Sequence, residues 1–286
     1  MGLDVEKIKE AGKIAKNVVD YAKDFIKPEM KLLDIANKID AKILELGGKP
    51  AFPVNLSVNE VAAHATPDWN SDEIAKGLLK VDLGVHIDGW IADTAFSLDL
   101  DNLEENKKLI ESAEAGLKSG LDKIGVSVEL KEIGIAISET ISKSGFSPII
   151  NLSGHSIEKY DLHSGITIPN IDNGNSSILN EGLYAIEPFV TNGSGKVRDG
   201  KPSGIFQLQN YGNVRDNFAR EVLNFIIDEY KELPFCSRWI HKKFGTRGLF
   251  ALRMIKQAGL LYEFAQLVEI GKGKVAQAEH SVLLKG

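Results

Sequence analysis

An Asp-Gly turn at 88–89 most constrains how this chain can fold. The segments 81–84 and 90–97 on either side of it are rich in apolar residues, and Asp-Gly between two such runs is a strong signal for a two-residue β-hairpin. A turn centred there pairs position 84 with position 93. Asp82 and Asp93 then become diagonal neighbours on one face of the ribbon, so both carboxylates point into the same small volume.

Either acid alone could be a solvated hairpin charge. Two acids among apolar neighbours favour a shared function, because a carboxylate in an apolar strand needs a partner to offset its desolvation. Three further residues are candidates to join them: His155 in NLSGHS, Glu187 in AIEPF and Glu279 in AQAEH. A lone histidine is more often structural than a ligand, but the surrounding acids favour ligation here. Oxygen and imidazole donors suit Mn, Fe(II), Co or Zn, so the set predicts two divalent metal ions bridged by carboxylates and water.

Composition narrows the class of protein. The 286 residues are 43% hydrophobic, which is ample for a core, and Cys236 is the only cysteine, which fits a reducing compartment such as the cytoplasm. A net charge of −6 argues against a stable nucleic-acid complex. No apolar run is long enough to span a membrane, and we expect a monomer by default.

The apolar periodicity predicts helices over 5–25, 32–46, 103–124 and 128–144. The second and fourth of these resemble each other at a constant offset, each ends at a glycine, and the string Asn-Leu-Ser follows both, at 55–57 and at 151–153. An amphipathic helix that ends at glycine is common, but the shared string favours an ancient duplication. The expected N-caps are Asp4, Asp101 and Ser127, and the expected C-terminal stops are Gly47 and Gly145.

If the halves are duplicates, the second half should also form a ribbon with two acids, Glu187 and Glu279. These lie 92 positions apart, and the sequence between them turns helical from about 216 to 261. We therefore expect a catalytic domain formed by 1–213 and 262–286, and a helical insertion subdomain at 214–261. The stretch 233–262 carries six basic residues and no acid. It is either a solvated helical face or a surface for transient contact with the ribosome.

These motifs resemble the type 2 methionine aminopeptidases in their archaeal short form. The resemblance spans nearly the whole chain and rests on VDLGVHIDGWIADTAFS, NLSGHSIEKYDLHSG, EGLYAIEPF, LPFCSRW and VAQAEH. It implies an α+β pita-bread fold: a pseudo-symmetric domain with a curved antiparallel sheet that cradles two metals, plus the helical insertion. The implied activity is metal-dependent removal of the initiator methionine from the N-terminus of nascent proteins, with preference for a small second residue.

The resemblance also implies roles for individual residues. Asp82 would chelate one metal, Asp93 and Glu279 would bridge both, and His155 and Glu187 would hold the other. Glu187 would also shuttle a proton, and two histidines would face the substrate: His64, which the sequence alone leaves equally readable as a turn histidine, and His163, in the strand-like run 160–168. The methionine pocket would be lined by Phe52, Leu162 and Phe264, the last replacing a more usual tyrosine.

Two other classes share this fold. Prolidase, aminopeptidase P and creatinase-type hydrolases usually carry an extra N-terminal domain, for which too few residues precede Asp82. Non-enzymatic pita-bread proteins bind RNA or other proteins and characteristically lose metal ligands, whereas all five are present here. Both alternatives are therefore less favoured than the aminopeptidase.

Overall fold

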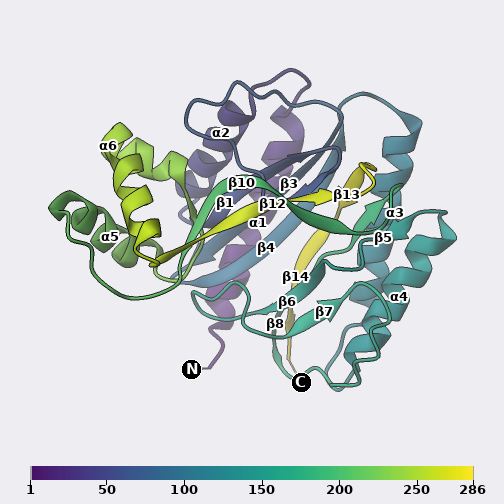
Figure 1. Cartoon of the computed structure of the whole chain (residues 1–286). Coiled ribbons are helices and arrows are strands. Elements are labelled where there is room, and N and C mark those ends of the chain that lie inside the picture. The colour runs from purple at the N-terminus through teal and green to yellow at the C-terminus, as the bar shows by residue number, and fades with distance from the viewer. Residues whose placement is uncertain (1, 286) are drawn as a thin grey trace.

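A seven-stranded antiparallel sheet forms the centre of the molecule, which the computed structural model describes over residues 2–285 (Figure 1). The first half of the chain contributes three strands and the second half four, and β4 meets β14 at the seam between them. The order across the sheet is β1 (Lys49–Val58), β3 (Leu78–Ile87), β4 (Trp90–Asp99), β14 (Glu279–Leu284), β8 (Gly182–Ile186), β6 (Ser153–Ile157) and β7 (Thr167–Pro169).

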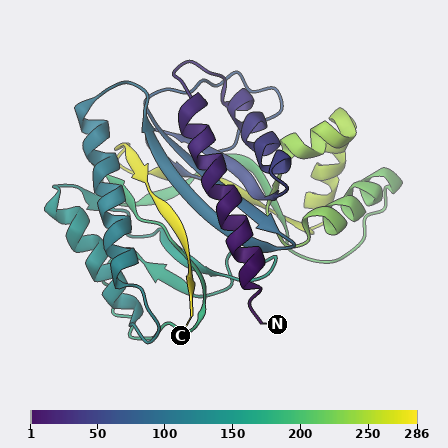
Figure 2. The same cartoon turned by 180° about the vertical axis from the view of Figure 1, so that it is seen from behind.

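Four helices cover the back of this sheet (Figure 2). Helices α1 (Val5–Phe25) and α2 (Leu32–Glu45) pack on the first half, and α3 (Glu104–Lys123) and α4 (Leu130–Lys143) pack on the second. All four lie within two residues of the positions that the periodicity predicts.

Strand alternation decides which side chains face these helices. On β3, Val81 and Leu83 belong to the apolar core under α1 and α2. Asp82, between them, points to the opposite face. The hairpin register is as expected, with Gly84 opposite Asp93, and the turn residues Asp88 and Gly89 have φ of 48° and 87°, as the favoured hairpin turn requires. The same alternation in the second half sends Glu187 and Glu279 to that face.

The expected helix ends are partly wrong. Asp4 caps α1 through the Lys7 amide, and Gly47 and Gly145 have the left-handed φ that ends α2 and α4. Asp101 does not cap α3, because its carboxylate instead accepts a hydrogen bond from the Gly77 amide at 2.9 Å. The N-cap residues of α3 and α4 are Leu103 and Glu129. Ser127 takes a left-handed φ of 67°, and its own amide donates to the Leu179 carbonyl.

The internal repeat is confirmed in the order of the elements. The first half runs α1, α2, β1, β3, β4, and the second runs α3, α4, β6, β8, β14. Glu187 directly follows β8, which pairs with β14, so the second ribbon forms even though a long excursion separates its strands. The pita-bread architecture expected from the sequence is therefore the one observed.

The excursion between β8 and β14 builds a second layer in front of the large sheet. Its long strands β10 (Val197–Leu208) and β12 (Leu261–Glu269) form a four-stranded sheet with β11 (Phe235–Cys236) and β2 (Val61–Ala63). Two short strands, β9 (Phe189–Thr191) and β13 (Val275–Gln277), pair with each other and, through β9, with β5 (Ser147–Pro148).

Helices α5 (Asn217–Tyr230) and α6 (Ser237–Gln257) project to one side of this layer (Figure 1). The expected helical stretch is therefore interrupted by β11, and Gly245 breaks α6 with a φ of 63°. The two helices share an apolar core with Phe206 of β10 and Leu261 of β12. The division into a catalytic domain and an inserted subdomain stays a prediction.

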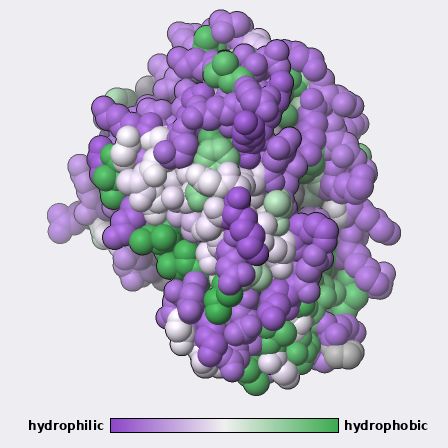
Figure 3. Space-filling model, turned by 90° about the vertical axis from the view of Figure 1, so that its right-hand side faces the viewer, coloured by the Kyte–Doolittle hydropathy of each residue, from purple (hydrophilic) through white to green (hydrophobic). Residues whose placement is uncertain are grey.

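The surface carries no large apolar belt on the face seen from the α3 and α4 side, which is mostly hydrophilic with small apolar patches (Figure 3). Within residues 2–285, none of the helices has the length and apolar character needed to cross a bilayer.

Candidate active site

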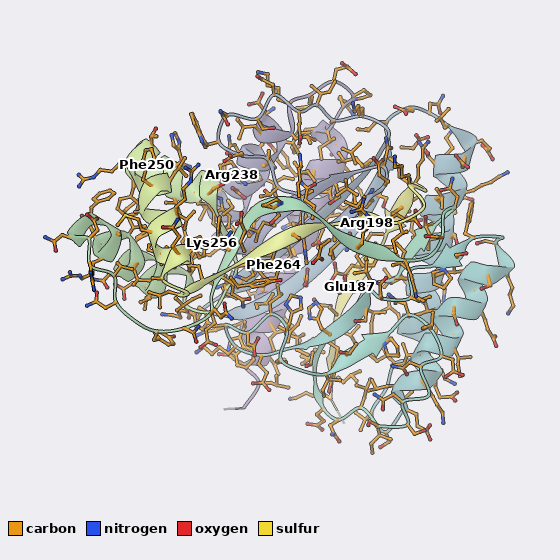
Figure 4. The ribbon with its side chains drawn as sticks, viewed as in Figure 1. Glu187, Arg198, Arg238, Phe250, Lys256 and Phe264 are labelled. Atoms are coloured by element: carbon orange, nitrogen blue, oxygen red, sulfur yellow. The ribbon has the colours of Figure 1, made fainter. Side chains whose placement is uncertain are left out.

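All ten residues proposed from the sequence line one cavity of about 260 Å³ between the large sheet and the β10–β12 ribbon. Four strands of the first half and several elements of the second converge there, so residues far apart in the chain meet. Phe264 on β12 and Glu187 lie near the centre of the molecule, whereas Phe250 and Lys256 lie out on α6 (Figure 4). The set comprises Phe52, His64, Asp82, Asp93, His155, Leu162, His163, Glu187, Phe264 and Glu279.

The five candidate metal ligands form a compact cluster. Ligand atoms of Asp93, His155 and Glu279 all lie within 4.8 Å of one another, and these three side chains are buried. His155 Nε2 is 3.6 Å from Asp93 Oδ2 and 3.5 Å from Glu187 Oε1. Asp82 enters from β3 beside them.

The acids of this cluster have fewer hydrogen bonds than buried carboxylates normally have. One oxygen each of Asp82, Asp93 and Glu279 is buried and has no protein partner. Burial raises the pKa of Asp82 to about 7, and burial together with repulsion between the acids raises the pKa values of Asp93, Glu187 and Glu279 well above their ordinary range. Unpartnered oxygens that repel one another fit a site that binds cations, and the donors match hard divalent metals.

His155 is oriented to offer a lone pair to this cluster. Burial lowers the pKa of its imidazole to about 3, with the neighbouring His163 adding to the shift, so the ring is neutral near pH 7 and its short contacts to the acids are not ion pairs. Its Nδ1 lies 3.4 Å from the Ser156 carbonyl. A proton on Nδ1 would leave Nε2 free toward Asp93 and Glu187, which is the form that ligates metals.

The two further histidines stand at the edge of the cluster. The His163 ring is 4.4 Å from the His155 ring, and the His64 ring is 5.2 Å from the Phe264 ring. Burial lowers the pKa of the His64 imidazole to about 4, and loss of solvent around the ring lowers that of His163, although the residue itself is exposed at the rim of the cavity. The prediction of a strand at 160–168 is wrong: His163 lies in a loop, because Tyr160 and Gly165 take left-handed φ angles and β7 begins only at Thr167.

The apolar wall of the cavity depends on a glycine in the hairpin. Phe52 on β1 lies over Gly84, where an added Cβ would come within 2.3 Å of the Phe52 ring. Leu162 and Phe264 complete the predicted apolar set, and Ile205 and Leu267 from the β10–β12 ribbon extend it.

Two further lining residues carry a sequence signal that does not by itself indicate a site. Asn55 and Asn151, the first residues of the repeated Asn-Leu-Ser string, both line the cavity. Asn55 on β1 lies opposite Asp82 on β3. The side chain of Asn151 both donates to and accepts from the backbone of Val197. The repeat was visible in the sequence, so its recurrence could have pointed to them.

Comparison with known proteins identifies the family. The model of metallopeptidase family M24 matches residues 6–215. A methionine aminopeptidase of Pyrococcus horikoshii is 46% identical over 99% of this chain and 97% of the relative. The chain belongs to the methionine aminopeptidases of metallopeptidase family M24.

Solved structures show the same fold at low sequence identity. A methionine aminopeptidase from Rickettsia prowazekii superposes with a TM-score of 0.71 at 21% identity, covering 99% of this chain and 93% of that one. A thermophilic Arx1 superposes with a TM-score of 0.84 at 15% identity, covering 99% and 89%. The expectations of a metallo-aminopeptidase, of the pita-bread fold and of divalent metal use are thus confirmed for this chain, whose donor cluster fits a metal.

Proposed function

We propose that this chain removes the initiator methionine from the N-termini of new polypeptides, with two divalent metal ions and with preference for a small second residue. The observation that carries the proposal is the cluster of four buried or half-buried acids and one neutral imidazole beside an apolar pocket. The similarity to the Pyrococcus horikoshii methionine aminopeptidase supports the substrate.

The cluster would hold the metals through the carboxylates of Asp82, Asp93, Glu187 and Glu279 and the imidazole of His155. When bound, the metals supply Lewis acidity that activates water for attack and polarises the scissile carbonyl. Mn, Fe(II), Co or Zn would each suit these donors, and cellular supply decides among them.

Glu187 is the proposed proton shuttle. Its half-buried carboxylate stands beside His155, and burial together with the charges of Asp93 and Asp82 raises its pKa well above the ordinary value, which favours uptake of a proton. Glu187 takes the proton of the attacking water and gives it to the leaving amine. Replacing Glu187 by Gln should remove most turnover, and a near-normal rate with bound metal would exclude this role.

The two histidines would orient the substrate. A hydrogen bond to the Ala265 backbone fixes one ring nitrogen of His64 as a donor, which leaves the other free to accept the scissile amide N–H. His163 would donate to the oxyanion that develops on the carbonyl. The methionine side chain would lie against Phe52, Leu162 and Phe264.

The decisive test is release of free methionine from Met-Ala-Ser by metal-free protein titrated with Mn(II), Co(II), Fe(II) or Zn(II). We expect release that requires metal and is lost in Asp93→Asn. Cleavage only of X-Pro control peptides would assign the chain to the prolidase or aminopeptidase P class. Metal binding without turnover on either substrate would favour a non-enzymatic role.

A transient ribosome contact through α6 is a second proposal, supported by exposed Lys242, Lys243 and Arg253. Arg238 does not belong to this surface, because it is buried against Asp40 at 2.6 Å. Electrostatic contact with RNA should weaken as salt rises, so co-sedimentation with ribosomes that does not weaken between 50 and 200 mM salt, a range over which three to five phosphate contacts should lose roughly 20- to 500-fold in affinity, would count against it. We propose a monomer in the reducing cytoplasm, consistent with the single buried thiol of Cys236.

A further inference from the structure

The seam between the two halves of the large sheet is joined by hydroxyl groups in place of part of the backbone ladder. Ser281 Oγ accepts a hydrogen bond from the Asp93 amide at 2.7 Å and donates to the Asp93 carbonyl at 2.8 Å. Ser97 does the same for Gln277, accepting from its amide at 2.9 Å and donating to its carbonyl at 2.8 Å. Each serine therefore fixes the backbone of one residue across the seam.

We call each such pair of hydrogen bonds, from one serine hydroxyl to the amide and carbonyl of one residue, a bracket. The two brackets are related by the internal repeat. Ser97 follows Asp93 by four residues, and Ser281 follows Gln277 by four residues. The brackets flank the pair in which Glu279 lies opposite Ala95. Gln277 thus occupies, in the second half, the place that Asp93 occupies in the first.

The side chain of Gln277 faces the acid cluster. Its neighbours Ala276 and Ala278 are in the core under α3 and α4, so strand alternation sends Gln277 to the other face, where it is only 1% exposed. Its Nε2 donates to Glu279 Oε2 at 3.3 Å, and the same amide hydrogen bonds to Asp82. Glu279 Oε1 and Asp82 Oδ1 stay without protein partners.

We propose that Gln277 is a positioning residue of the metal centre. Its amide holds one ligand from each half of the sheet, Asp82 and Glu279, while Ser97 fixes the backbone from which it reaches them. A neutral donor suits this place because it orients both carboxylates without adding a fifth negative charge. The inference rests on the proposed metal chemistry and adds a residue that orients the ligands.

The test compares Gln277→Met, which keeps the size but removes the donor, with Gln266→Met. Gln266 is also buried, lies on β12 and does not line the cavity, so its variant is a matched control. Cobalt(II) would be titrated into metal-free proteins by calorimetry, and the visible absorption spectrum of the cobalt-loaded proteins recorded. We expect Gln277→Met to bind cobalt about 10- to 100-fold more weakly with an altered spectrum, and Gln266→Met to match the wild type.

A Gln277→Met protein with wild-type cobalt affinity and spectrum would show that Gln277 only fills space and would overturn the proposal. If Gln277→Met does not fold, Gln277→Leu also removes the donor without adding a charge or a metal ligand, and the same two readouts decide. Wild-type protein that binds cobalt but releases no methionine would overturn the proposed function while leaving this comparison of metal binding intact.

Discussion

Glu269 and Glu279 are both almost fully buried, at 1% and 3% exposure, and both lie near the end of the chain. Their surroundings are opposite. Glu269 accepts hydrogen bonds from the amide and hydroxyl of Ser194 and from the Gly273 amide. Glu279 accepts one weak bond from Gln277, shares a hydrogen bond with Asp93 and faces Asp82 and Glu187 across the cavity.

The pKa values follow this contrast. Burial alone would raise the pKa of Glu269, but its hydrogen bonds outweigh burial and lower it. Burial and repulsion raise the pKa of Glu279 well above its ordinary value. The comparison shows that depth of burial alone does not decide whether the pKa of a carboxylate is raised or lowered, because the hydrogen bonds and charges around it also count. The chain itself satisfies Glu269, which joins two loops, and leaves Glu279 to be satisfied by a cation.

Glu279→Gln should have the largest effect on activity. Loss of an acid that holds metal should lower methionine release by more than the roughly 10- to 100-fold typical of supporting partners. The metal-free variant should nevertheless unfold at the same temperature as the wild type or higher, because one of the repelling charges is gone. Turnover assays and thermal unfolding in chelator check both parts, and a lower melting temperature of the metal-free variant would break the comparison.

The stability of the metal-free protein should depend on pH as the raised pKa values of the acid cluster require. A raised carboxyl pKa means that the folded state binds more protons than the unfolded state, so stability falls as pH rises toward the folded pKa, by up to about 1.4 kcal/mol per pH unit for each group. Unfolded histidines have an ordinary pKa of 6.5 and still release protons up to about pH 7.5, whereas the folded ones have lowered pKa values and are already neutral, so the histidines add the opposite slope below that pH. Between about pH 7.5 and 8.5 the histidines are nearly neutral in both states, and the slope belongs mainly to the acid cluster.

We expect the unfolding free energy of metal-free protein to fall over this interval, and the slope to flatten in Glu279→Gln. Adding metal should restore stability most at the upper end, since metal binding displaces the protons. Denaturant unfolding at several pH values measures this. Stability that rises with pH in the metal-free wild type would show that the acids are not held as described.

Glu269→Gln sharpens the other side of the comparison. The substitution keeps the shape but sets an amide group against donors, so the unfolding free energy should fall by about 1–3 kcal/mol. Because the pKa of Glu269 is lowered, its contribution is present above the ordinary value of 4.5 and is lost as pH falls through the folded value. Cobalt stoichiometry should not change. A lower cobalt stoichiometry with an unchanged unfolding free energy would mean that Glu269 helps to hold the metal and does not stabilise the loops.

The acid cluster was accessible from the sequence because local rules place it. The Asp-Gly turn fixes the register between Asp82 and Asp93, and alternation fixes the face. Helical periodicity likewise located α1 to α4 closely. The positions of His155, Glu187 and Glu279 came from motifs, and the cavity brings them together.

What the sequence could not give depends on partners distant in the chain. The donors to Glu269 include Ser194, which is 75 residues away in the chain. Asp101 does not cap α3 as expected, because it accepts a hydrogen bond from Gly77, 24 residues away. Gln277 is two residues from Glu279, but nothing local indicates that Ser97 brackets it across the seam. Such contacts are set by how the two halves and the β10–β12 ribbon pack.

The smallest effect should come from Ser194→Ala, which removes one of the donors to Glu269. The Ser194 and Gly273 amides remain, so the carboxylate keeps most of its partners and the unfolding free energy should fall by only about 0.5–1.5 kcal/mol. The variant should have no additional effect in a Glu269→Gln background, because the charge that the hydroxyl served is absent. A double-mutant cycle by denaturant unfolding measures this coupling. Additive losses would mean that the hydroxyl stabilises the loop independently of Glu269, and the contrast with Glu279 would then rest on backbone amides alone.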